Sequence, residues 1–287
     1  MTEQELQQQR SHKWRLDGER VQTLEQARAF VDDVGFCLMY PDRSLPFVPT
    51  FMGAFSGSAE HLPDTKHAFA DPRSQQATDL MVRLLRERTA FEMSLSPSTD
   101  VIISAAIFPF FYALIGDRNP KAPPKLRSQG ARISPLTINV FDALRQHGPL
   151  SKEKLRELVG HEPSNAALDR ALGELWTILK ITRVDYRESE GAIWDVLFRW
   201  APDVVKEGAG ISAPEAISAL ISKYLQTVVA AGQDDIEQLF SHLASRTKIR
   251  DAVNALLAAR ELSVLAIGTR TMVHLTPEPE QRRRVNG

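Results

Sequence analysis

The sequence predicts an α+β protein that is mostly helical, with an α-rich N-terminal domain followed by tandem winged-helix domains. The first observation is an internal repeat, because apolar residues coincide without a gap when the chain is shifted by 81 positions against itself. The second is that both copies predict three helices followed by two strands. A core pattern repeated at a fixed spacing is typical of two copies of one supersecondary unit. The coinciding pairs are Val140/Ile221, Leu144/Leu225, Leu155/Ile236, Leu158/Leu239, Leu168/Ile249, Leu172/Val253, Leu175/Leu256, Ile181/Leu262 and Val184/Leu265.

The first copy covers residues 134–202 and has the pattern of a winged helix. Its first helix is expected at 136–146, and residues 148–151 are expected to form a turn. Ser151 and Ser164 stand where side-chain N-caps would begin the second and third helices. Alternating apolar residues then predict two strands, at 181–186 and 193–198, that form the wing.

The second copy covers residues 212–276 and repeats this plan. Its first two helices are expected at 216–229 and 234–243, and Ser245 is expected to cap the third. Two strands, at 262–267 and 271–275, would form a tight hairpin around Gly268-Thr269-Arg270.

The N-terminal domain is expected to span residues 1–117. Residues 101–115 are apolar nearly all round, so either a buried helix or a strand followed by a helix fits them. Helix starts are expected at Thr2/Glu5 and Thr23/Gln26, which have capping-box spacing, and at Asp71-Pro72.

Residues 118–133 form a basic strap between the N-terminal domain and the first copy. Five basic residues and no acidic one occur there, and prolines keep the segment extended. Such a strap suits contact with DNA phosphates, because lysine and arginine displace condensed counterions. A solvated linker between domains fits the same residues.

The two copies differ where a winged helix would contact DNA. In the first copy the third helix and the wing tip are largely acidic, with Asp169, Glu174, Glu188 and Glu190 beside Arg170. In the second copy they are basic, and a helix N-terminus also favours phosphate. We therefore expect the second copy and the strap to contact double-stranded DNA, and the first copy to act as a spacer or face a protein partner. The expected DNA-binding residues are Arg246, Lys248, Arg250, Arg270, Arg118, Lys121, Lys125 and Arg127.

Composition is that of a soluble globular protein, with 43% hydrophobic and 25% charged residues. The net charge of −1 means that affinity for DNA must come from local patches. The single cysteine, Cys37, and the lack of a secretory signal or a long apolar run favour a cytoplasmic protein outside the membrane. No spacing typical of a metal site or a bound cofactor occurs, so none is expected. Residues 277–287 form a tail that carries Arg282-Arg283-Arg284.

The order of these segments resembles the AlkZ/YcaQ group of bacterial DNA glycosylases. The likeness rests on the helix that ends in the apolar run 30–40, on the segment 104–109, and on the winged helices that follow. The group removes alkylated or crosslinked purines from DNA and consists largely of tandem winged helices. The resemblance therefore implies DNA binding and a third, divergent winged helix within residues 1–117.

The catalytic motif of that group departs from this sequence. The motif is Gln, an apolar residue, then Gln or Asp, directly after the first helix. Here the corresponding stretch is Cys37-Leu38-Met39-Tyr40, in which no residue can activate water. Asp32 and Asp33 lie nearby and could supply a carboxylate, but a solvated or capping pair at a helix end fits them better. The catalytic residues are unknown, and whether the chain is an enzyme stays open. The alternatives are a non-catalytic transcriptional regulator and a protein-interaction scaffold.

Overall fold

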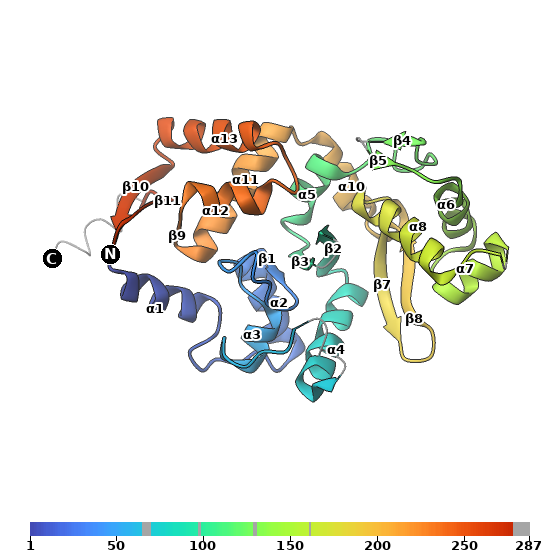
Figure 1. The fold of residues 1–287 in the computed structure, drawn as a ribbon, viewed down its shortest axis with the longest axis horizontal. Coiled ribbons are helices and arrows are strands. Elements are labelled where there is room, and N and C mark those ends of the chain that lie inside the picture. The colour runs from blue at the N-terminus through green and yellow to red at the C-terminus, as the bar shows by residue number, and fades with distance from the viewer. Residues whose placement is uncertain (65–69, 97–98, 129–130, 161, 278–287) are drawn as a thin grey trace.

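The computed structural model describes residues 1–64, 70–96, 99–128, 131–160 and 162–277 (Figure 1). Within these residues one order of elements recurs: a helix, a short strand, two helices, and two longer strands. Each group forms a small antiparallel sheet in which the last strand lies between the other two. We call these groups the first, middle and third units.

The first unit consists of α2 (Leu24–Val34), β1 (Phe36–Leu38), α3 (Phe51–Ser56), α4 (Pro72–Arg86), β2 (Ala90–Ser96) and β3 (Thr99–Ser104). The middle unit consists of α6 (Pro135–His147), β6 (Leu150–Ser151), α7 (Lys152–Val159), α8 (Asn165–Thr177), β7 (Ile181–Arg187) and β8 (Gly191–Val196). The third unit consists of α11 (Ala213–Val228), β9 (Ala230–Ala231), α12 (Gln233–Phe240), α13 (Arg246–Ala258), β10 (Leu262–Ile267) and β11 (Arg270–Leu275).

The remaining elements connect the units. They are α1 (Glu3–Lys13), α5 (Phe108–Ile115), β4 (Arg127–Ser128), β5 (Ala131–Arg132), α9 (Leu197–Trp200) and α10 (Pro202–Gly210). In Figure 1 the third unit lies above the first, and the middle unit lies to the right of both.

Most of the expected helix starts coincide with the observed ones. Thr2 and Thr23 each form a capping box, and Asp71 caps α4 with Pro72 in its first turn. Ser151 and Ser164 accept hydrogen bonds from the first turns of α7 and α8. The sequence therefore determines these boundaries locally, through side chains that satisfy free backbone amides.

Some expectations about local structure were wrong. Residues 148–151 are not only a turn, because Leu150 and Ser151 pair with β8 as strand β6. The second strand of the middle unit ends at Val196, and residues 197–200 form α9. Of the two alternatives for residues 101–115, the strand followed by a helix is observed, whereas the strap is not only extended but contains the β4–β5 pair. The N-terminal part also has a three-stranded sheet, which the term α-rich did not include.

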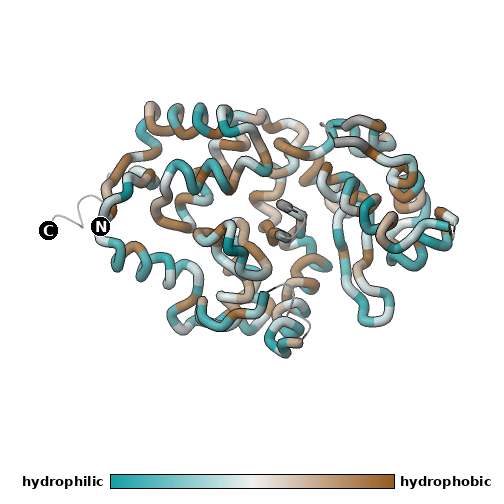
Figure 2. Tube along the Cα trace, in the orientation of Figure 1, coloured by the Kyte–Doolittle hydropathy of each residue, from teal (hydrophilic) through white to brown (hydrophobic). Residues whose placement is uncertain are grey.

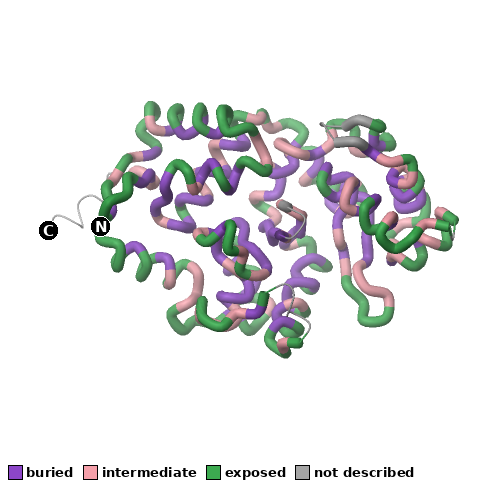
Figure 3. The backbone as a smooth tube through the Cα atoms, in the orientation of Figure 1, coloured by how far each residue is buried: buried purple, intermediate pink, exposed green. Residues whose placement is uncertain are grey.

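The cores explain how the units are joined. One hydrophobic cluster runs from the β1–β3 sheet through α5 to α11, α12 and α13, so the first and third units share a core. The middle unit has its own core, in which Trp176 packs edge-on against Trp194. Figure 3 shows the buried chain gathered between the first and third units, around α5 and the short strands.

Side chains of α1 complete the third unit. Arg10 is buried, and its guanidinium donates to the carbonyls of Val228 and Ala230 at 2.9 and 2.7 Å. Between these carbonyls Val229 has a φ of +71°, which a β-branched residue rarely adopts. Trp14 donates its indole N–H to the carbonyl of Thr227 at 3.2 Å. The first helix of the chain thus satisfies the carbonyls at the end of α11.

Candidate nucleic-acid interface

The first turns of α13 carry the exposed cations of the third unit. Arg246 and Lys248 are both exposed, and α13 begins at Arg246, after Ser245. Figure 2 shows hydrophilic residues along the outer turns of the first half of this helix. Two cations beside free backbone amides and the positive end of a helix dipole form a surface that favours phosphate.

Arg250, one turn further along α13, is held by Glu237 of α12. Its Nε and Nη2 donate to the two carboxylate oxygens at 2.6 and 2.9 Å. The Glu237 side chain is only 5% exposed, whereas that of Arg250 is 56% exposed. The guanidinium hydrogen bonds hold the pKa of Glu237 below its ordinary value and raise the pKa of Arg250. This pair therefore stays ionised and joins two helices.

Arg270 lies at the start of β11 and is also paired. Its Nη2 donates to the carboxylate of Asp235 at 2.8 Å, and its guanidinium carbon lies 5.6 Å from the centre of the Phe47 ring. Asp235 also accepts from the backbone N–H of Gly232 at 3.1 Å, at the start of α12. The expected wing cation is thus attached to α12 and to the first unit.

The strap carries exposed cations, and the buried side chain of Lys180, from the middle unit, binds it. Arg118, Lys121 and Lys125 are exposed, and Arg127 lies in β4. The ammonium of Lys180 is buried. It donates to the carbonyl of Ala122 at 2.6 Å and lies 3.0 Å from the Asp117 carboxylate. It also donates to the carbonyl of Asn119.

The acidic residues of the middle unit are partly engaged inside it. Glu174 accepts from the backbone N–H of Ser134 at 3.0 Å and from the hydroxyl of Thr137, so it supports the start of α6. Asp169 accepts from Lys152 at 2.9 Å, and Glu190 pairs with Arg187 at the wing. Sequence alone could not show these contacts.

The two carboxylates of α12 were not predicted from the sequence. At the 81-residue spacing, Glu237 and Arg250 correspond to Arg156 and Asp169 of the first copy. The second and third helices of the two copies therefore carry opposite charges at corresponding positions. In the first copy, however, Asp169 pairs with Lys152, so the reversal alone does not identify the Glu237–Arg250 pair.

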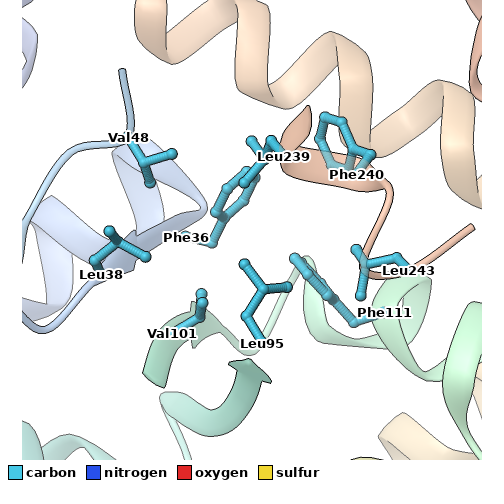
Figure 4. A pocket seen from close by; sticks show the side chains of 9 residues that line it. All are labelled: Phe36, Leu38, Val48, Leu95, Val101, Phe111, Leu239, Phe240 and Leu243. Atoms are coloured by element: carbon cyan, nitrogen blue, oxygen red, sulfur yellow. The ribbon is translucent and has the colours of Figure 1, made fainter. Parts of the chain in front are cut away.

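The stretch at the place of the catalytic motif is buried. Cys37, Leu38 and Met39 are at most 5% exposed and lie within or next to β1. Burial raises the pKa of the Cys37 thiol, so a reactive thiolate is disfavoured. Leu38 also lines a small apolar pocket between the first and third units (Figure 4).

That pocket contains no group for hydrolysis. Its lining consists of Phe, Leu and Val side chains, which point toward one another in Figure 4. The space enclosed for a water-sized sphere is about 10 Å³, which is the room of a single water at most. Asp32 and Asp33 do not line it; they are exposed at the end of α2, where Asp33 lies 3.5 Å from Arg15.

No helix among the described residues is long and apolar enough to cross a membrane. No group of three or more His, Cys, Asp or Glu side chains within them could hold a metal ion. Residues 278–287, with the three arginines of the tail, lie outside the described part of the chain.

Comparisons with known proteins show which fold and which family this chain shares. The structure of the DNA glycosylase AlkZ from Streptomyces sahachiroi superposes with a TM-score of 0.56 at 14% sequence identity, over 98% of this chain and 72% of that one. This likeness shows a shared fold. No curated protein matches the chain. The profile of the family described as DNA glycosylase AlkZ-like matches residues 69–286. Because this match covers most of the chain, the protein belongs to the AlkZ-like DNA glycosylase family.

Proposed function

We propose that this protein binds double-stranded DNA in the cytoplasm without hydrolysing the N-glycosidic bond. Membership of a DNA glycosylase family supports a DNA partner. The observation that carries the proposal is the pair of exposed cations, Arg246 and Lys248, at the start of α13, where no carboxylate of the described residues forms an ion pair with them. The exposed strap residues Arg118, Lys121 and Lys125, with Arg127, would extend this surface.

We propose further that each of the three units is a winged helix. Their shared element order and sheet order support this assignment. The domains would then be the first winged helix within 1–117, the strap 118–133, the second winged helix 134–202, the third 212–276, and the tail 277–287. In each, the two longer strands and the turn between them would correspond to the wing.

The absence of hydrolysis is supported by the residues around β1. A glycosylase needs a carboxylate or amide that places the attacking water. The motif positions hold Cys37, Leu38 and Met39, and the adjacent pocket is lined by apolar side chains. This member of the family would therefore bind DNA but lack the group that places water for hydrolysis of the N-glycosidic bond.

The experiment is a duplex titration by fluorescence anisotropy at 50 to 200 mM salt. We expect affinity that falls steeply with salt and weakens about tenfold or more when Arg246 and Lys248 are both replaced by Ala. Replacement of Lys206, an exposed lysine of α10, is the matched control and should leave affinity unchanged. Lack of duplex binding at the lowest salt would contradict the proposal.

A second assay tests the proposal that the protein does not hydrolyse the N-glycosidic bond. DNA that contains 7-methylguanine is incubated with the protein, and released base is measured. We expect no release by a protein that binds the duplex, which is the behaviour of a regulator. Release above the rate of a no-protein control would show a glycosylase whose water-activating group lies elsewhere.

A scaffold function is the second candidate, and the middle unit favours it. Its wing tip carries Glu188 and Glu190, and Tyr186 of its wing is 45% exposed. An aromatic side chain among charges is typical of a protein-contact surface. Absence of DNA binding, together with a partner that is lost on replacement of Tyr186 by Ser, would favour this candidate.

A further inference from the structure

Two cations of the candidate DNA surface are neutralised by one helix. Both carboxylate oxygens of Glu237 accept from Arg250, and Gln233 donates its amide to the same carboxylate at 3.3 Å. Two residues earlier on α12, Asp235 accepts from Arg270. The side chains of Glu237 and Asp235 are 5% and 17% exposed, whereas those of Arg250 and Arg270 are 56% and 44% exposed. The carboxylate is thus the less exposed partner of each pair.

The middle unit lacks this arrangement of α12 carboxylates, because its residues differ at the corresponding positions. At the position of Arg250 it has Asp169, which accepts from Lys152 of the preceding helix. An ion pair between the second and third helices thus occurs in both units, with the acid on opposite helices. In the third unit the acid on α12 cancels positive charge on α13.

The consequence for DNA follows from counterion release. A cation that is already paired with a carboxylate neutralises no phosphate charge unless that pair is given up. Each phosphate that is neutralised contributes about −0.9 to the slope of log K against log salt. Paired guanidinium groups therefore add little to either the affinity or its salt dependence.

We infer that Glu237 and Asp235 limit the affinity of the third unit for duplex DNA by neutralising Arg250 and Arg270. This inference rests on the proposed function. In the free protein the unit presents Arg246 and Lys248 to DNA, and the acids of α12 hold two further cations out of phosphate contact. The affinity is set below the value that the basic residues of the sequence would give.

The test compares duplex binding of the full chain with that of Glu237→Gln and Asp235→Asn. The amides keep the size of the acids and one acceptor oxygen but remove the negative charge, and a thermal melt checks that each variant stays folded. We expect each variant to bind about three- to tenfold more tightly at 50 mM salt, with a salt slope steeper by about one. The double variant E237Q/R250A should lose the gain, because the freed guanidinium is its source.

Glu207→Gln is the matched control. Glu207 is exposed on α10 and its replacement changes the net charge equally. If the wild type binds but both variants bind no more tightly than E207Q, the inference is overturned while the proposed function stands. If neither the wild type nor any variant binds duplex at 50 mM salt, the proposed function fails and the inference fails with it.

Discussion

Glu92 of β2 and Arg183 of β7 form an ion pair across the contact between the first and middle units. The Nη1 of Arg183 lies 3.1 Å from Oε1 of Glu92, whose side chain is 3% exposed. The guanidinium also pairs with Asp100 and lies over the rings of Trp176 and Trp194. Burial raises the pKa of Glu92 from its ordinary 4.5 to about 7, although Arg183 opposes the shift.

Because of this raised pKa, we expect the free energy of unfolding to fall as the pH rises. Between pH 4.5 and 7 the folded chain keeps a proton on Glu92 that the unfolded chain has lost. The stabilisation is complete below pH 4.5 and is lost as the pH rises through 7. Glu92→Gln should remove this part of the decline. Urea unfolding of both proteins at pH 5, 6 and 7 measures it, and parallel curves for the two would contradict the assignment.

Lys180 is predicted to stabilise the folded protein, because its ammonium binds backbone carbonyls of the strap. Lys180→Met leaves the Asp117 carboxylate and the carbonyls of Asn119 and Ala122 without their buried donor. We expect a loss of roughly 3 kcal/mol in the free energy of unfolding. Lys206→Met, on the exposed surface of α10, is the control. Equal stability of the two variants would show that the buried ammonium is dispensable.

Arg10→Ala tests the contact between α1 and the third unit. The carbonyls of Val228 and Ala230 would lose their hydrogen bonds from a charged donor. If the two carbonyls are counted as one site, the free energy of unfolding should fall by about 1.5 to 3 kcal/mol. Denaturant unfolding measures the loss. Arg28→Ala, at an exposed position of α2, should change stability little, and a similar loss there would argue against a special role of Arg10.

Arg250 and Arg246 should behave differently although both lie on α13. Arg250→Ala leaves the buried Glu237 carboxylate without its guanidinium, so we expect a lower melting temperature and less than about a twofold change in duplex affinity. Arg246→Ala should weaken duplex binding and leave the melting temperature unchanged. Anisotropy and thermal melts separate the two effects, and the reverse pattern would refute the assignment.

Cys37 should be inert toward thiol reagents in the native protein. It is 0% exposed, and burial raises the pKa of its thiol. We expect no reaction with Ellman's reagent under native conditions and one equivalent in 6 M guanidinium. Rapid native reaction would mean that β1 opens easily.

The caps and the repeat explain why much of the fold could be predicted from the sequence. Thr2, Thr23 and Ser164 act within their own helices, so a local pattern determines them. The strand pairing of the first unit was not predicted from the residues, because β1 pairs with Ile103 and its neighbours across more than sixty residues that include α3, α4 and β2. Long-range pairing leaves no periodic signal in a strand of three residues.

The candidate site was only partly predictable for a similar reason. The sequence indicates which residues of α13 are basic, and the structure places Arg246 and Lys248 on its exposed surface. Whether a cation is free depends on a partner from another element. Glu237 and Asp235 take up two of the expected cations, and such pairing is a tertiary property.

The contact between Arg10 and the end of α11 joins residues 218 positions apart. During synthesis α1 leaves the ribosome before its partners, which follow roughly 10 to 40 seconds later at about 5 to 20 residues per second. Through this interval Leu6 and Arg10 have no third unit to pack against. The earliest helix of the chain is therefore among the last to reach its final position, and the nascent protein closes only when its C-terminal unit has emerged.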